Sequence, residues 1–305
     1  MFSNKKNVSI LLASYNGSKY IEEQLESIRK QTYSATEVII KDDASVDNTC
    51  KIVQDFIWKY NLHDRWKLVC NSENQGWKKN FVDGLNYVHG DYIFFCDQDD
   101  IWNKYKIEKS IEKFEINSEI ELLATNYRVI KSDTSRSWIN QKKADGMVTK
   151  YNAGNRFLYV LYPGCTYCIK KELLPLYKVF WKESIPHDAF VWHFAHMRGS
   201  LYIYNDEMID YRRHKNTVTG KSINNREERL KEIKYLDAIL RYYKEDENYY
   251  SCHKKNIEEA EKWLINRYKG LSGEALLRIL QNYQYISYYW SWKTFIMDIL
   301  YTVVK

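Results

Sequence analysis

The stretch that decides the fold is YIFFCDQDD, which runs from Tyr92 to Asp100 and places a short apolar segment directly before three carboxylates. The apolar run is too short for a helix, so residues 92–96 are predicted to form a buried strand. Ligands of open parallel sheets bind in the crevice beyond the carboxyl ends of the strands. Clustered carboxylate oxygens suit hard cations such as Mg²⁺ or Mn²⁺. The stretch therefore predicts a metal that holds a phosphate, and a solvated acidic turn is the simpler alternative.

The composition indicates a globular protein. The chain has 305 residues, of which 45% are hydrophobic and 28% are charged, so it can form one large domain or two smaller ones. Residues 1–211 carry 28 Lys and Arg against 28 Asp and Glu, and the net charge of +6 therefore resides entirely in the last third. This basic third suits anionic lipid, a phosphate-bearing substrate or a solvated helix face. Nucleic acid is not an expected partner, because no motif for it is recognisable.

The N-terminal segment does not resemble an export signal. Its apolar run covers only residues 8–13, which is too short for a secretory signal. We therefore expect the chain to stay in the cytoplasm with its six cysteines reduced. Cys165 and Cys168 have the spacing of a zinc half-site, but no second pair completes it.

Short apolar runs alternate with helical periodicity through the first half of the chain. Strands are predicted at residues 8–13, 37–41, 66–70 and 92–96, with an amphipathic helix after each of the first three. This order predicts an α/β fold in which a mostly parallel sheet carries helices on both faces. Further strands are expected at residues 122–125 and 201–204, and helices from Asn225 onward.

Polar turns follow the first three predicted strands at residues 13–17, 42–45 and 71–77. A carboxylate at a strand end can bind a base or a ribose, although helix capping is its ordinary role. Together with Asp97 and Asp99, these turns outline a nucleotide diphosphate, with the base at the second strand and the pyrophosphate on a metal at Asp99. The glycine motifs of dinucleotide-binding folds and of P-loops are absent.

Four segments in this order resemble the motifs of inverting family 2 glycosyltransferases with the GT-A fold. They are ASYNG at 13–17, DDASVD at 42–47, NQGWKKN at 74–80 and DQDDIW at 97–102. YRRHKN at 211–216 is similar to a segment of the rhamnosyltransferase-like branch. The resemblance implies a Rossmann-like GT-A sheet in two halves, followed by a helical extension. The expected parts are a nucleotide-sugar-binding half at 1–125, an acceptor-binding half at 126–220 and the extension at 221–305.

The resemblance also implies roles for individual residues. Asp188 is the expected general base, with His187 in place of the glutamate that usually precedes it, although Asp188 also suits a helix cap. A divalent cation, Mn²⁺ or Mg²⁺, is expected on Asp99 and His214, and an exposed loop histidine is the alternative for His214. The expected nucleotide-sugar-binding residues are Ala13, Ser14, Tyr15, Asp42, Asp43, Gly76, Lys79, Asn80, Asp97, Arg212 and Arg213.

The function that the resemblance implies is metal-dependent, inverting sugar transfer. Transfer of one sugar at a time is expected because the motif of processive synthases is missing. The donor would be dTDP-L-rhamnose and the acceptor a hydroxyl of a lipid-linked precursor of a cell-surface polysaccharide. A UDP-hexose or UDP-N-acetylhexosamine donor remains an alternative. So do two other classes of protein, a nucleotidyltransferase and a non-catalytic binding protein.

The C-terminal stretch 283–304 is rich in Tyr, Trp and Ile. Lys293 and Asp298 make it a poor membrane-spanning helix. Its aromatic residues suit peripheral contact with the inner face of a membrane, and an amphipathic helix packed onto the body of the protein would show the same pattern.

Overall fold

The computed structural model describes residues 6–131, 144–214 and 225–303. The chain forms two compact units. The first comprises residues 1–151 and 162–217, and the second comprises residues 152–161 and 218–305. The short segment 152–161 therefore belongs with the C-terminal helices, although its position in the sequence lies inside the predicted acceptor-binding half.

The first unit contains a nine-stranded sheet in its described residues, in the order β3-β2-β1-β4-β8-β6-β9-β5, with β7 also paired to β9. The strands are β1 (Val8–Ser14), β2 (Glu37–Asp42), β3 (Trp66–Cys70), β4 (Tyr92–Asp97), β5 (Ile101–Trp102), β6 (Leu122–Lys131), β7 (Val148–Lys150), β8 (Tyr167–Lys170) and β9 (Leu201–Arg213). The helices are α1 (Ile21–Arg29), α2 (Thr49–Lys59), α3 (Trp77–Gly84), α4 (Lys106–Ile116), α5 (Leu174–Phe180) and α6 (His187–Met197), with 3₁₀ turns η1 (Leu85–Tyr87), η3 (Gly164–Thr166) and η4 (Lys171–Leu173). The α/β class is confirmed.

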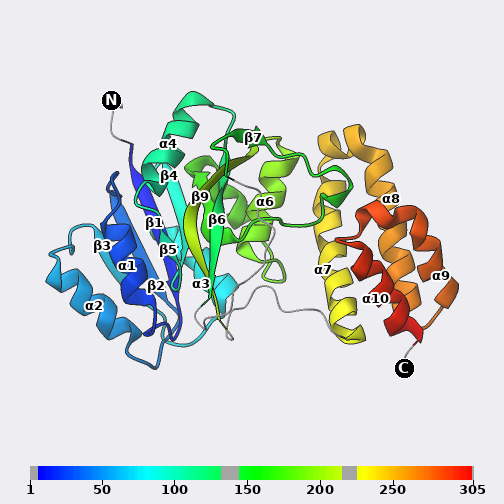
Figure 1. The fold of residues 1–305 in the computed structure, drawn as a ribbon, viewed down its shortest axis with the longest axis horizontal. Coiled ribbons are helices and arrows are strands. Elements are labelled where there is room, and N and C mark those ends of the chain that lie inside the picture. The colour runs from blue at the N-terminus through cyan, green and yellow to red at the C-terminus, as the bar shows by residue number, and fades with distance from the viewer. Residues whose placement is uncertain (1–5, 132–143, 215–224, 304–305) are drawn as a thin grey trace. The chain divides into compact units, whose positions relative to one another are not determined.

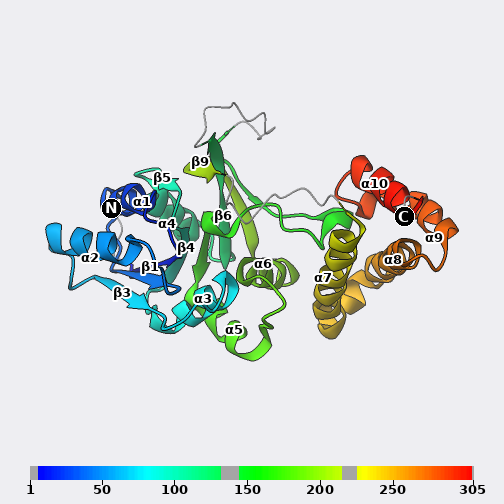
Figure 2. The same ribbon diagram turned by 90° about the horizontal axis from the view of Figure 1, so that it is seen from below.

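The residues of β1 alternate between the two faces of the sheet, as the period of two in a strand requires. Val8, Ile10 and Leu12 share one core with apolar residues of α1, α2 and α4. Leu11 points to the opposite face, where it contacts the backbone of Gly84 in α3 so closely that a Cβ there would lie 2.6 Å from its Cδ1. Helices consequently cover both faces (Figure 2).

The strand register aligns the polar turns that the sequence places after β1, β2 and β4. These strands are parallel, and Ala13 lies opposite Asp97 while Ser14 lies opposite Asp42. The turns predicted from the sequence therefore meet at one edge of the sheet.

The second half of the sheet departs from the predicted strands. β6 and β9 lie side by side as a parallel pair of ten residues or more (Figure 1), much longer than the predicted 122–125 and 201–204. β8 inserts antiparallel between β4 and β6, and it was not predicted. These added residues are largely polar or lie in short runs. Their strand conformation therefore depends on pairing with neighbouring strands and not on a local apolar pattern.

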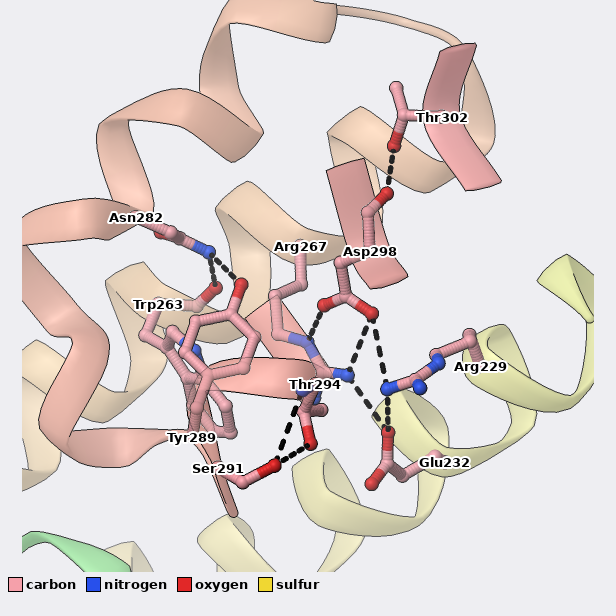
Figure 3. A network of polar contacts seen from close by, with 10 residues as sticks. All are labelled: Arg229, Glu232, Trp263, Arg267, Asn282, Tyr289, Ser291, Thr294, Asp298 and Thr302. Carbon is pink, nitrogen blue, oxygen red and sulfur yellow. Dashed lines mark hydrogen bonds and ion pairs between the residues drawn. The ribbon is translucent and has the colours of Figure 1, made fainter. Parts of the chain in front are cut away.

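The second unit is helical, as the sequence predicts. Its elements are η2 (Gly154–Arg156), α7 (Arg226–Glu245), α8 (Glu247–Ser272), α9 (Leu276–Gln281), η5 (Asn282–Tyr288) and α10 (Trp292–Val303). Apolar residues of α7 and α8 such as Leu236, Ile239 and Trp263 are buried between them. Figure 3 shows a buried network in which Arg267 of α8 and Asp298 of α10 form an ion pair.

The C-terminal helix α10 packs only one of its faces into this unit. Phe295 and Asp298 are buried. Trp292, Ile296, Leu300 and Val303 are all exposed. Across the described ranges, we find no helix with both the length and the apolar character that crossing a bilayer requires.

Candidate active site

A cluster of acidic side chains lies at the carboxyl end of β4. Asp97 and Asp100 each place a carboxylate oxygen within 4.8 Å of the other and of Cys165 Sγ, which comes from η3. Burial raises the pKa of Asp97 well above its ordinary value, and the charges of Asp100, Asp99 and Asp188 raise it further. Burial and the charge of Asp99 raise the pKa of Asp100 to about 7. The site therefore concentrates carboxyl groups whose ionised form a cation would stabilise.

Lys106 is a fully buried cation behind this cluster. Its Nζ lies 3.3 Å from the carbonyl oxygen of Thr166 and 4.9 Å from the centre of the Trp102 ring. Burial lowers the pKa of Lys106 to about 8, although Asp100 is among the groups that oppose this shift. No acidic side chain forms an ion pair with Lys106 in the described structure. Its positive charge therefore acts on the acidic cluster as a whole and is not neutralised by one partner.

The end of β9 closes the site from the other side. His214 Nε2 lies 2.7 Å from Asp99 Oδ2. Arg212 donates from its backbone N to Asp100 Oδ1 at 2.9 Å and from Nε to the carbonyl oxygen of Asp99 at 2.7 Å. Its Nη2 forms an ion pair with Glu23 of α1 at 2.5 Å. The fold thus brings Asp99 and His214 together from positions 115 residues apart.

Tyr20, just before α1, supports both of these β9 residues. Its ring stacks on His214 with 5.1 Å between centroids, and the Arg212 guanidinium lies 4.8 Å from the same ring. The neighbouring Arg213 has its guanidinium 5.8 Å from the Tyr211 ring, and its buried Nε has no hydrogen-bond partner in the described structure.

The donor set at Asp99 fits a divalent cation. A carboxylate oxygen and an imidazole nitrogen already face each other, and Mn²⁺ accepts both kinds of ligand. Burial raises the pKa of Asp97, and the neighbouring charges of Asp100, Asp99 and Asp188 add to this shift. Asp99 and His214 are thus suitable ligands, and their role as ligands stays a prediction.

Asp188 occupies the second position of α6 and approaches the backbone of η3. A Cβ on Gly164 would lie 2.6 Å from Asp188 Cβ, so only glycine leaves room for this side chain. Asp188 Oδ1 accepts a hydrogen bond from Ala189 N at 2.8 Å, although Pro186 is the N-cap residue. A contact with the helix N-terminus therefore coexists with a position beside the acidic cluster, since Asp188 also raises the pKa of Asp97.

His187, at the position where the resemblance implies a glutamate, is buried among aromatic rings. It stacks on Phe81 at 3.9 Å between centroids and meets the edge of Trp77. Burial lowers the pKa of His187 to about 4, so its ring is neutral at physiological pH. Neither ring nitrogen has a hydrogen-bond partner in the described ranges.

The two carboxylates at the end of β2, Asp42 and Asp43, organise the surrounding loops. Asp42 Oδ2 accepts hydrogen bonds from the hydroxyls of Ser14 and Ser45, each at 2.7 Å. Asp43 accepts hydrogen bonds from three donors of the loop after β3: Asn71 Nδ2 at 2.7 Å, Gln75 N at 2.8 Å and Gly76 N at 2.9 Å. Both carboxylates are buried. Their contact with a nucleotide stays a prediction, and their observed role is to hold the turns in place.

Of the residues predicted around α3, Gly76 and Asn80 lie in the same network, whereas Lys79 pairs within the helix. Gly76 has a φ of +85°, a left-handed conformation that favours glycine, and it forms the N-cap of α3. Asn80 is buried and donates from Nδ2 to the carbonyl oxygen of Lys41 at 2.9 Å. Lys79 Nζ forms an ion pair with Asp83 at 2.6 Å, and this hydrogen bond raises the pKa of Lys79.

The turn after β1 is connected to the β4 motif by Gln98. Tyr15 N donates to Gln98 Oε1 at 2.9 Å, and Gln98 Nε2 donates to the carbonyl oxygen of Tyr15 at 3.0 Å. A Cβ on Gly17 would lie 2.0 Å from Gln98 Oε1, so this glycine permits the contact. Ala13 ends opposite Asp97 in the register of β1 and β4. The Tyr15 ring remains 44% exposed, available to a ligand.

A comparison with protein families identifies this arrangement. Residues 9–172 match the family described as glycosyl transferase family 2. The chain belongs to glycosyl transferase family 2. This membership makes it a glycosyltransferase, with the acids of β4 and the turns of β1 and β2 inside the matched region.

Two relatives of this glycosyltransferase have informative names. The dTDP-rhamnosyl transferase RfbG of Shigella flexneri is 35% identical over 231 residues, which are 70% of this chain and 74% of the relative. An Escherichia coli protein, UDP-Glc:alpha-D-GlcNAc-diphosphoundecaprenol beta-1,3-glucosyltransferase WfgD, is 34% identical over 127 residues, which are 42% of this chain and 48% of the relative.

Two solved structures confirm the GT-A fold of the glycosyltransferase. TarS residues 1–349 from S. aureus, in complex with UDP-GlcNAc, matches with a TM-score of 0.62 at 19% identity over 87% of this chain and 72% of TarS. The mannosyltransferase PcManGT from Pyrobaculum calidifontis, in complex with GDP-Man and Mn²⁺, matches with a TM-score of 0.57 at 16% identity over 99% of this chain and 86% of the mannosyltransferase.

Some residues of this site were not predicted from the sequence. Tyr20, Glu23 and Lys106 lie on or beside helices and carry no motif that distinguishes them from surface or core residues. Gln98 lies inside the recognised motif, and its position between two aspartates was the available signal.

Proposed function

We propose that this glycosyltransferase transfers L-rhamnose from dTDP-L-rhamnose to a hydroxyl of a lipid-linked polysaccharide precursor, with a divalent cation and with inversion at the anomeric carbon. The observation that carries the mechanism is the meeting of Asp99 with His214 at 2.7 Å, beside the cluster that Asp188 adjoins. A metal ligand set and a carboxylate base within one site are the parts this chemistry needs.

In this mechanism Asp188 removes the proton of the acceptor hydroxyl while that oxygen attacks the anomeric carbon. Attack from the face opposite the leaving diphosphate inverts the configuration. A divalent cation held by Asp99 and His214 would supply positive charge to the leaving diphosphate. Arg213, with its unpaired Nε, adds a hydrogen-bond donor where that negative charge develops.

The choice of donor and acceptor is supported by the relatives. The relative with 35% identity is a dTDP-rhamnosyl transferase, and its alignment extends over 70% of this chain. The E. coli relative acts on a sugar attached to diphosphoundecaprenol, which is a lipid-linked acceptor. A UDP-hexose donor is the second candidate, because the same relative uses UDP-Glc.

Calorimetry and a transfer assay test this proposal on the purified full chain. We expect dTDP to bind more tightly with Mn²⁺ than without it, and more tightly than UDP or GDP. Asp99→Ala should remove the Mn²⁺ dependence, whereas Asp188→Asn should retain dTDP binding and lose transfer to a synthetic diphospholipid-linked sugar. Asp64→Ala changes an exposed carboxylate outside the four motif segments and serves as the control. Transfer that survives Asp188→Asn would overturn the assignment of Asp188 as the base. Tighter binding of UDP than of dTDP would overturn the assignment of dTDP-L-rhamnose as the donor.

We also propose that the enzyme works at the cytoplasmic membrane surface through α10. Its exposed residues Trp292, Ile296, Leu300 and Val303 follow a spacing of 4, 4 and 3, so they form one apolar stripe along the helix. The exposed charged residues from 262 to 303 are four cations and one anion, namely Lys262, Lys269, Arg278, Lys293 and Glu274. An apolar, aromatic stripe with basic neighbours fits an anionic lipid surface.

Sedimentation with vesicles tests this contact. The full chain should sediment with phosphatidylglycerol vesicles and should not bind phosphatidylcholine vesicles. The triple change Trp292→Ser, Ile296→Ser and Leu300→Ser should abolish binding to phosphatidylglycerol. Trp58→Ser removes a 78% exposed tryptophan from the first unit and should have no effect. Absence of vesicle binding, together with a dimer that the triple change dissociates, would assign the stripe to a second copy of the chain instead.

A further inference from the structure

Two cysteines outside the catalytic cluster lie in contact with each other. Cys50 is the second residue of α2 and Cys70 is the last residue of β3, and their Sγ atoms are 3.6 Å apart. Cys70 is exposed, whereas Cys50 is partly buried. Cys252, also exposed, belongs to the second unit and provides an internal comparison.

Asp42 lies against this pair. One of its carboxylate oxygens and the two sulfur atoms all lie within 4.8 Å of one another. Burial, together with the hydrogen bond to Asp42, raises the pKa of Cys50 well above its ordinary value. Cys50 therefore keeps its proton, and the exposed Cys70 is the thiol that a reagent reaches first.

We propose that Cys50 and Cys70 form a thiol modification site that closes to a disulfide on reaction with a low-molecular-weight disulfide such as oxidised glutathione. The Cys70 thiolate attacks one sulfur of the reagent and releases one thiolate, which leaves a mixed disulfide on Cys70. Cys50 then attacks the Cys70 sulfur and loses its proton as the new bond forms, which releases the second thiolate. The two protons of the cysteines end on the two released thiols, so two cysteine thiols are oxidised and one disulfide is reduced.

The new bond would strain the loops beside the proposed nucleotide site. A disulfide holds its sulfur atoms at about 2.05 Å, so the two atoms must approach by about 1.5 Å from their present contact. Asn71 directly follows Cys70, and it donates from N to the Asp42 carbonyl at 2.8 Å and from Nδ2 to Asp43 at 2.7 Å. Displacing β3 here should weaken nucleotide binding, a consequence that rests on the proposed function, whereas the disulfide itself does not.

Mass spectrometry of the full chain after treatment with oxidised glutathione and alkylation tests the site. We expect a Cys50–Cys70 cross-linked peptide that is two hydrogens lighter than its reduced parts, and a mixed disulfide on Cys252. In Cys50→Ser, the reaction of Cys70 should end at the mixed disulfide. Cys252→Ser should leave the Cys50–Cys70 cross-link unchanged. A persistent mixed disulfide on Cys70 in the unaltered chain would overturn the proposal. So would a pair of thiols that react only after a chelator is added, because that result indicates a bound metal.

Calorimetry with dTDP tests the consequence for binding. Affinity should fall about tenfold on oxidation, the loss expected when one hydrogen bond to a charged group is broken, and it should return with a reductant. Cys70→Ser should bind dTDP in the same way before and after oxidation. Equal affinity of the cross-linked and reduced chains would overturn the regulatory effect. If the reduced chain binds no nucleotide although the cross-link forms, the proposed function fails and the modification site stands.

Discussion

The buried ion pair of the second unit offers a sharp test of how this unit is held together. The Asp298 carboxylate is fully buried and lies 2.6 Å from Arg267 Nε and 3.3 Å from Arg229 Nη1 (Figure 3). Glu232 binds Arg267 Nη2 at 2.8 Å. Burial alone would lower the pKa of Arg267, but the charges of Asp298 and Glu232 hold that pKa well above its usual range. Arg267 is therefore charged and depends on these two anions.

Replacing Asp298 with asparagine should leave the two guanidinium groups with one anion in a buried setting. Breaking a buried pair in this way costs about 3–5 kcal/mol of unfolding free energy. The charge-neutral double change Arg267→Met with Asp298→Leu should cost less than Asp298→Asn alone, because it leaves no excess charge buried. Asp237→Asn breaks a solvent-exposed pair with Arg241 on α7 and should change little.

Hydrogen exchange followed by mass spectrometry measures each unit separately in the full chain. Peptides from α7, α8 and α10 should exchange about 10²- to 5 × 10³-fold faster in Asp298→Asn, which corresponds to the expected free-energy loss. Peptides from the sheet provide the internal reference, and Asp237→Asn provides the matched control. Exchange in Asp298→Asn that equals exchange in the control would show that the buried pair does not stabilise this unit.

Three further predictions concern the glycosyltransferase unit. Gly164→Ala should lower the rate of transfer about 10²-fold with nucleotide binding retained, since its Cβ would lie 2.6 Å from Asp188 Cβ and must displace this proposed base. An unchanged rate would contradict the prediction. Because the pKa of His187 is about 4 in the folded chain, below its unfolded value, its neutral ring contributes stability that is present above pH 6.5 and is lost as pH falls toward 4. Urea unfolding at pH 6.5 and 4.5 should show this loss, about 2 kcal/mol, in the unaltered chain and not in His187→Phe. Tyr20→Ala should weaken Mn²⁺ binding in calorimetry because its ring stacks on His214, whereas Tyr20→Phe should not, and equal weakening in both would refute the stacking argument.

The first half of the fold could be predicted because its signals are local. β3 has the predicted bounds 66–70, and β1, β2 and β4 each extend one residue beyond the predicted run. An apolar run flanked by turn residues is enough to place a buried parallel strand. The fourth strand also predicted the acidic cluster, because Asp97 and Asp99 lie at its end in any register.

The second half could be predicted only in part. β6 continues from Thr125 into the polar Asn126, and β9 continues from Tyr204 into Asn205 and Asp206, where the apolar pattern ends. The two strands are held by each other in a parallel pair with register shifts near Asn126. Backbone hydrogen bonds between segments distant in sequence stabilise these strands where the local apolar pattern ends. Such hydrogen bonds leave no periodic pattern in the sequence from which they could be predicted.

The sequence by itself determined the α/β order, the helical C-terminal extension and the residue types at the strand ends, because apolar period and turn chemistry act over a few neighbouring residues. The tertiary structure decided which of those residues meet. Asp99 reaches His214, and Gly164 makes room for Asp188, only because strand order brings distant segments to one edge of the sheet. Cys50 and Cys70 touch for the same reason. Contacts of this kind depend on long-range packing, which spacing along the chain does not encode.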